Sequence, residues 1–167
     1  MRRPAGVDDR KYEQYLGRLR ENQNLGAGLL SGIVAAAVGA VAWAAFTYAT
    51  NYKLGLTAII VGAFVGYAVR RFGRGVDIQF KIMGATLALL GCLAGNLLMV
   101  CAILARQEKL SLVAVISLLT PAKVVRLVQV TFDSADILFY GIAVFEGFKI
   151  AARELTQADY LKINDMP

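Results

Sequence analysis

The chain has no histidine and only two cysteines among its 167 residues. Zinc and haem sites depend mainly on these two residue types, so we expect no metal, no cofactor and no histidine-dependent catalysis. Cys92 and Cys101 lie nine positions apart in one apolar run, which is about 13 Å along a helix. The Cα atoms of a disulfide lie within about 7 Å, so we expect two free thiols that pack as small apolar side chains.

Charged residues are also scarce, at 18% of the chain, whereas hydrophobic residues make up 57% and the mean hydropathy is +0.56. A soluble domain has roughly 25% charged and 45–50% apolar residues. The composition therefore predicts an integral membrane protein, and the length indicates a single membrane domain over residues 1–167. The positive residues behind the net charge of +6 flank apolar runs instead of forming a basic cluster with aromatics, which argues against nucleic-acid binding.

Four apolar runs predict an all-α, polytopic membrane protein built as a four-transmembrane-helix bundle. About 20 apolar residues cross the hydrocarbon core of a bilayer. The expected spans are residues 25–49, 54–70, 82–105 and 135–152. The first and third contain no charged residue, whereas Glu146 and Lys149 interrupt the fourth.

The segment 106–134 separates the third and fourth spans and is expected on the outer side. Its part Leu110–Leu119 is apolar but only ten residues long, which is typical of an interfacial or re-entrant segment. Thr120 and Pro121 form a standard helix start, and the pattern beyond them predicts an amphipathic helix in the membrane interface. A fifth span through Leu110–Val130 is the alternative.

The N-terminal tail, residues 1–24, is expected to be cytoplasmic and to form an amphipathic helix over Val7–Asn22, capped by Asp8. Its apolar face at helical spacing consists of Tyr12, Tyr15, Leu16 and Leu19. This face either lies along the inner leaflet, with the neighbouring arginines on anionic headgroups, or docks a partner subunit. Residues 153–167 form the second cytoplasmic tail.

Thirteen of the 18 lysine and arginine residues fall on one side of the four predicted spans. They are Arg2, Arg3, Arg10, Lys11, Arg18, Arg20, Arg70, Arg71, Arg74, Lys81, Lys149, Arg153 and Lys162. Because positive residues favour the cytoplasmic side, both termini are expected in the cytoplasm, and a fifth span would weaken this bias. An interfacial aromatic belt at the outer end of the first span is expected from Trp43, Phe46, Tyr48 and Tyr52.

Glycines at four-residue spacing recur in the first three spans. The pairs are Gly28 and Gly32, Gly62 and Gly66, and Gly91 and Gly95. Such pairs let membrane helices approach closely, so they predict tight packing within the chain. The alternative is that one small-residue face is left for a homo-oligomer or another membrane subunit. Asn96, in the third span, is expected to bond a neighbouring helix, which is worth about 0.6–2 kcal/mol.

Two further groups of polar residues are candidate sites. Glu146 lies near mid-depth of the fourth span, where a carboxylate must be protonated, paired or in contact with water. Lys149 is its expected ion-pair partner one turn away, and a proton or cation site is the alternative. Arg70, Arg71 and Arg74 belong to a glycine-rich basic turn that is a candidate contact for lipid headgroups, although topology alone accounts for them.

Three runs carry a family resemblance: GYAVRRFGRGVD at 66–77, FKIMGATLALLGCLAGNLL at 80–98 and DILFYGIAVFEGFK at 136–149. Over about residues 54–149 the chain resembles a group of small bacterial four-span inner-membrane proteins with a similar basic loop and a glycine-rich third helix. The resemblance implies four spans and a bacterial inner (cytoplasmic) membrane. The group has no assigned activity.

The sequence shows no nucleophile and base arrangement, so an enzyme is not expected. We expect a non-enzymatic integral membrane subunit or a scaffold and assembly partner of a membrane complex. Its partners are then the lipid bilayer and either further copies of the chain or other membrane subunits. The alternative is a component of a small transporter or channel that uses the intramembrane carboxylate of Glu146.

Overall fold

The computed structural model describes residues 8–50 and 55–165. Within these ranges the chain forms eight α-helices and no strand, which confirms the all-α prediction. The helices are α1 (Asp9–Glu21), α2 (Leu25–Thr50), α3 (Leu56–Gly73), α4 (Ile78–Gln107), α5 (Leu112–Ser117), α6 (Pro121–Thr131), α7 (Ser134–Ala151) and α8 (Gln157–Asn164). The expectations for Arg2, Arg3, Val7 and Tyr52 concern residues outside the described ranges.

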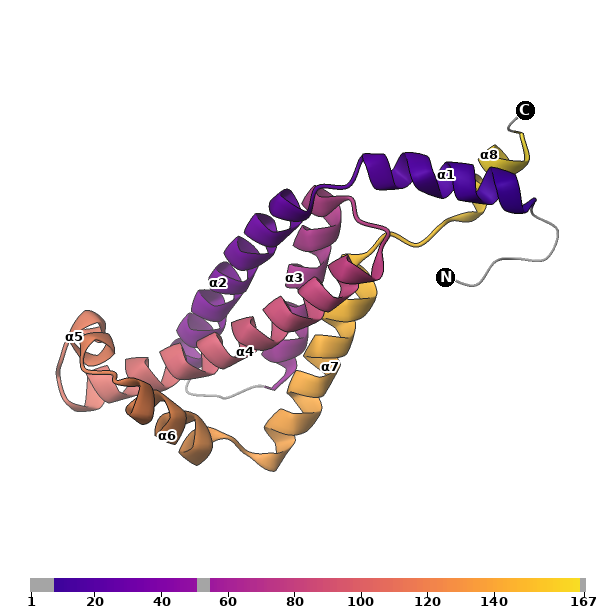
Figure 1. Cartoon of the computed structure of the whole chain (residues 1–167). Helices are drawn as coiled ribbons and strands as arrows, with labels where there is room; N and C mark the ends of the chain where they lie inside the picture. Colours follow the sequence, from indigo (N-terminus) through magenta and orange to yellow (C-terminus); the bar gives the residue numbers. More distant parts are fainter. Residues whose placement is uncertain (1–7, 51–54, 166–167) are drawn as a thin grey trace.

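Helices α2, α3, α4 and α7 pack side by side and form a bundle (Figure 1). Helices α2, α3 and α4 are each long and apolar enough to cross a membrane, whereas α6 and α7 meet this condition only as a pair bent by 104°. The described residues therefore provide three candidate spans, or four if the bent pair counts as one. Helix α7 does not meet the condition by itself, because it carries three charged residues, Asp136, Glu146 and Lys149.

The bundle has small residues inside and large apolar residues outside. In α2, Gly32, Ala35 and Ala40 are buried, whereas Leu30 and Val34 are 67% and 61% exposed. A water-soluble domain buries most of its large apolar side chains. Small residues at helix contacts, with large apolar ones directed outward, are instead typical of helices packed in lipid. The distribution of side-chain size thus agrees with the composition in indicating a membrane protein.

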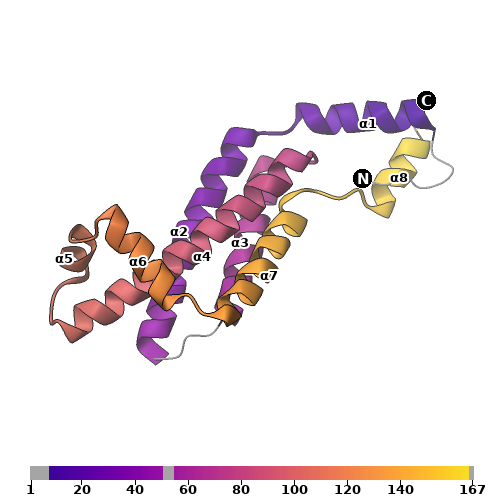
Figure 2. The same cartoon turned by 60° about the horizontal axis from the view of Figure 1, so that its bottom comes forward.

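Helices α5 and α6 lie against the far end of α4, beyond the rest of the bundle (Figure 2). Thr120 caps α6 and Pro121 is its first residue, as predicted. The fifth-span alternative is wrong, because Leu110–Val130 is divided between a helix of 6 residues and one of 11. Each is far shorter than the roughly 20 residues of a span.

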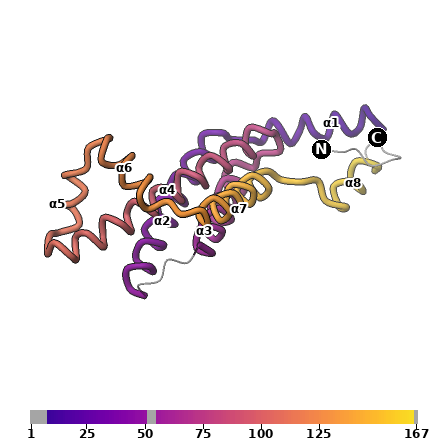
Figure 3. Tube along the Cα trace, turned by 90° about the horizontal axis from the view of Figure 1, so that it is seen from below, coloured from indigo at the N-terminus to yellow at the C-terminus, as the bar shows by residue number. Residues whose placement is uncertain are grey.

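Helices α1 and α8 leave the opposite end of the bundle and pack together as an arm (Figures 1 and 3). Asp8 caps α1, as predicted. Tyr12 and Leu16 are each only 8% exposed and pack with Ile163 of α8. Helix α8 therefore covers this part of the apolar face of α1, whereas Tyr15 and Leu19 stay half-buried, and a contact of α1 with lipid or with a partner subunit remains a prediction. The described ends of the chain lie at the same end of the bundle, which we call the arm end.

Candidate functional site at the arm junction

The arm joins the bundle at the short loop 74–77 between α3 and α4, which we call the junction loop. Arg74 ends α3 with a φ of 50°, in the left-handed conformation common after a helix. Gln23 Oε1 accepts a hydrogen bond from a backbone N–H of the loop at 3.0 Å, and its Nε2 donates to Asp77 Oδ2 at 2.9 Å. Arg20 Nε donates to Asp77 Oδ1 at 3.0 Å. These contacts fix the linker between α1 and α2 to the junction loop.

The chain that leaves α7 is fixed to the same loop. The backbone N–H of Arg153 donates to the Gly75 carbonyl at 2.8 Å, and its Nη2 donates to Asp159 Oδ1 at 2.7 Å. Tyr15 Oη donates to the same carboxylate oxygen at 2.6 Å. The backbone N–H and hydroxyl of Thr156 both donate to Asp159 Oδ2 at 2.9 Å. Asp159, which is 1% exposed, thus links α1, α8 and the loop.

The Asp159 carboxylate stays ionised at neutral pH. Burial by itself raises its pKa, but the hydrogen bonds from Tyr15, Thr156 and Arg153 together lower that pKa well below its usual range. Each of these donors favours the charged form of the carboxyl group. Burial and the hydrogen bond to Asp159 raise the pKa of Tyr15, which remains a proton donor. The contact between α1 and α8 therefore does not switch near neutral pH.

A basic pocket with a volume of about 440 Å³ lies beside the junction loop. Its lining contains four arginines and no acidic residue: Leu19, Asn22, Tyr67, Arg70, Arg71, Arg74 and Arg153. The structure thus gathers the three arginines predicted from the basic turn and adds Arg153. Arg71 and Arg74 also line a neighbouring, more polar hollow that includes Glu21. The sequence signal for Arg153 was weak, since a basic residue after a predicted span is ordinary.

The six glycines predicted to pack lie at helix crossings within the chain. Their contacts are Gly28 with Gly73 and Phe80, Gly32 with Val69 and Leu87, Gly62 with Ala143, Gly66 with Gly147 and Ile150, Gly91 with Ala36 and Val61, and Gly95 with Ala40 and Trp43. All these partners belong to the same chain, so these glycine faces are occupied within it. An interface with another subunit then requires a different surface.

Helix α7 packs through a small-residue row that the sequence analysis did not identify. Gly147 contacts Gly84 and Ala88 of α4 on one side and Gly66 of α3 on the other. Ala143, Gly147 and Ala151 are spaced four residues apart and all buried. The same four-residue rule that identified the glycine pairs, widened to include alanine, finds this row.

Asn96 is 1% exposed, and its Nδ2 lies 3.5 Å from the Thr131 hydroxyl of α6. Its Oδ1 has no hydrogen-bond partner among the described residues, and the same holds for Trp43 Nε1 and Thr47 Oγ1 of α2. Trp43 is 2% exposed and packs edge-on against Tyr140 at 6.1 Å between ring centroids. Its expected place in an interfacial belt was wrong, since the indole points into the bundle.

The expected ion pair between Glu146 and Lys149 is not formed. Within residues 8–50 and 55–165 no contact of 4.0 Å or less joins these two side chains. Lys149 Nζ instead lies 6.0 Å from the centre of the Phe145 ring, and Glu146 is half-buried. Lys149 is exposed on the outer surface of α7, so its long side chain reaches the surface and turns away from Glu146.

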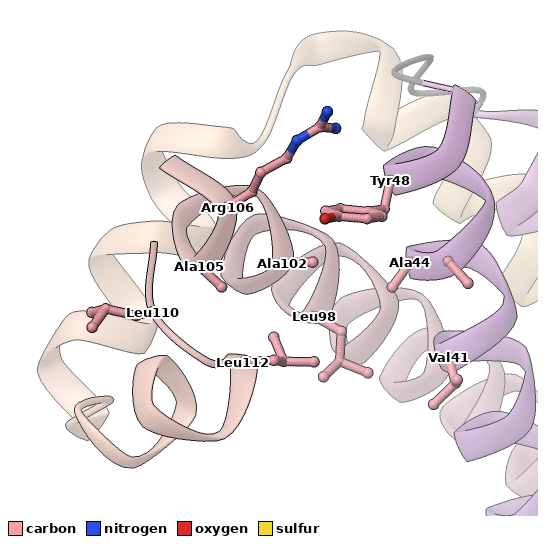
Figure 4. Close-up of a pocket in the computed structure, with 10 residues that line it drawn as sticks. Val41, Ala44, Tyr48, Leu98, Ala102, Ala105, Arg106, Leu110 and Leu112 are labelled. Atoms are coloured by element: carbon pink, nitrogen blue, oxygen red, sulfur yellow. The ribbon is translucent and has the colours of Figure 1, made fainter. Parts of the chain in front are cut away.

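An apolar groove of about 380 Å³ lies between α2 and α4 near α5. The Arg106 guanidinium carbon is 5.4 Å from the centre of the Tyr48 ring, and the two side chains face each other above the groove (Figure 4). A cation held over an aromatic face gains about 0.5–1 kcal/mol at an exposed site. This groove has one basic residue, in contrast to the four at the arm end.

Neither a protein-family model, nor a curated protein, nor a solved structure matches the chain. Both cysteines are free and buried. Within the described ranges no three His, Cys, Asp or Glu side chains gather in a way that could hold a metal ion. The arm junction is a polar network within these ranges that joins α1, α8 and the loop between α3 and α4.

Proposed function

We propose that the chain is a non-enzymatic membrane subunit or scaffold that holds the arm of α1 and α8 as a rigid platform for another subunit. The observation that carries this proposal is the network around Asp159. A buried carboxylate that receives hydrogen bonds from Tyr15, Thr156 and Arg153 fixes two helices far apart in the sequence. A surface that is ordered before binding avoids the entropy cost of ordering on association.

The same proposal includes four spans in a bacterial inner membrane, with the arm in the cytoplasm. The contact between α1 and α8 requires an even number of crossings, and most lysines and arginines belong to the arm end. Single cysteines at Lys162 and Lys123 test this arrangement, because the native Cys92 and Cys101 are buried. A membrane-impermeant maleimide added to spheroplasts should label Lys123→Cys and spare Lys162→Cys. The opposite pattern contradicts the orientation.

Purification in mild detergent tests the subunit role. The native mass should exceed that of one chain, through further copies or a co-purifying membrane protein. Asp159→Asn weakens the arm and should release the partner, whereas Asp165→Asn, an exposed change next to α8, should keep it. A chain that stays monomeric and brings no partner refutes the proposal.

A transporter component is the second candidate, favoured by the buried Asn96 Oδ1, Thr47 Oγ1 and Trp43 Nε1 that have no partner in the described ranges. Unpartnered polar atoms inside a membrane bundle are costly, and a passing polar solute or water would satisfy them. In proteoliposomes, Asn96→Leu and Glu146→Gln should then reduce ion or proton flux. Unchanged fluxes in both variants exclude this role.

A further inference from the structure

The basic pocket collects more positive charge than its surroundings neutralise. Among the described residues only Arg153, of its four arginines, has a carboxylate within 4.0 Å. Arg71 is placed over Phe72, at 6.0 Å from the ring centre. Four guanidinium groups around one hollow repel one another, and an anion placed between them removes that repulsion. Guanidinium groups also match the geometry of phosphate oxygens, with which they form paired hydrogen bonds.

The pocket continues into an apolar stripe along α3. Ile60, Phe64, Tyr67 and Arg71 recur at steps of four, three and four residues, so they lie on one face of the helix. The three apolar or aromatic members are 62%, 44% and 59% exposed. Ile60 and Phe64 also line an apolar groove of about 440 Å³ between α2 and α3, which has no charged lining residue. An apolar groove thus leads to a cluster of arginines.

The length of this stripe matches one leaflet of a bilayer. From Ile60 to Arg71 the helix rises about 17 Å at 1.5 Å per residue, and half of a hydrocarbon core is about 15 Å thick. The arginines stand where α3 ends, at the level expected for headgroups, with Tyr67 just below them as an interfacial aromatic. A ligand that matches this surface has a long apolar tail and a phosphate at one end.

We propose that this surface binds one anionic phospholipid, with its phosphate between Arg70, Arg71, Arg74 and Arg153 and an acyl chain along Ile60 and Phe64. Arg153 bonds both Gly75 and Asp159, so the phosphate lies beside the residue that ties the arm to the junction loop. The lipid thereby fixes the arm at the membrane surface. This assignment does not depend on the subunit role.

Native mass spectrometry of the full chain in mild detergent tests the proposal by titration with phosphatidylglycerol or with phosphatidylcholine of the same acyl chains. One phosphatidylglycerol should bind in preference to phosphatidylcholine. An arginine near a lipid phosphate contributes about fivefold in affinity, so R70Q/R71Q/R74Q should weaken binding on the order of 100-fold. The matched control R10Q/R18Q/K162Q removes the same charge from exposed positions at the arm end outside the pocket, and should stay within about threefold of the parent.

The tail is tested separately with Phe64→Ala, which should weaken binding of the long-chain lipid and leave a six-carbon-chain analogue unaffected. Equal losses in the pocket and control variants overturn the proposal, since they indicate diffuse attraction. So does equal binding of the two headgroups. Inorganic phosphate that binds as tightly as the lipid, with the same arginine dependence, assigns the pocket to a soluble anion instead. If the triple variant does not fold, unchanged affinity in Arg70→Gln overturns the assignment.

Discussion

Replacing Gly62 with alanine tests a close backbone contact between α3 and α7. A Cβ atom at Gly62 would lie 2.7 Å from the carbonyl carbon of Ala143 and 2.8 Å from its Cα. Real Cβ atoms do not approach backbone atoms so closely, and no rotamer change relieves the overlap, so α3 and α7 must move apart. Overpacking of this kind costs about 1–3 kcal/mol. Gly141→Ala on α7 is the matched control, because nothing lies within 4 Å of its new methyl group.

The two variants should change the free energy of unfolding in opposite directions. Alanine is favoured over glycine in a helix by up to about 1 kcal/mol, and Gly141→Ala should show this gain, whereas in Gly62→Ala the overlap outweighs it. Because the helix gain is common to both variants, their free energies of unfolding should differ by the cost of the overlap, about 1–3 kcal/mol. Equilibrium unfolding by dodecyl sulfate in mixed micelles measures this, with Trp43, the single tryptophan and 2% exposed, as the fluorescent probe. Equal stability of the two variants would refute the α3–α7 crossing at Gly62.

Three further changes probe the arm and the bundle core. The folded pKa of Asp159 is lowered, so its carboxylate contributes stability that is fully present above the unfolded pKa of about 3.9. This stability is lost as the pH falls toward the folded pKa. Hydrogen exchange of α8 between pH 7 and 3 should therefore show protection that declines only below about pH 4. Arg20→Gln removes an exposed ion pair to Asp77 and should destabilise the arm by less than about 1 kcal/mol in the same exchange measurement. Asn96→Leu removes a buried oxygen without a partner in the described ranges, so dodecyl sulfate unfolding should show a loss below about 1 kcal/mol, or a gain.

The features that the sequence predicts correctly are local. The charge-free runs of α2 and α4, the Asp8 cap and the Thr120-Pro121 helix start each depend on residues within a few positions of one another. For these features the local pattern is sufficient because hydropathy and capping chemistry act over one or two helical turns.

The features that were missed connect distant parts of the chain. The apolar face of α1 was visible, but its partner α8 is short and mostly polar, with Ile163 as its one fully buried apolar residue. Tyr15 and Asp159 are 144 positions apart, and no periodicity links them. The predicted ion pair between Glu146 and Lys149 was wrong for the opposite reason. Helical spacing permits the contact, but the lysine side chain reaches the exposed surface of α7.

The junction loop connects the four helices of the bundle to the arm. It joins α3 to α4 directly and holds the start of α2 through Gln23. The N–H of Asn24 also donates to the carbonyl of Gly73, the last residue of α3, at 2.9 Å, and Arg153 fixes the end of α7 to the loop. All four bundle helices therefore meet at residues 73–77, and both linkers to the arm begin there. A change in the tilt of any one bundle helix moves an anchor of the arm, so the packing of the bundle sets the position and rotation of the arm.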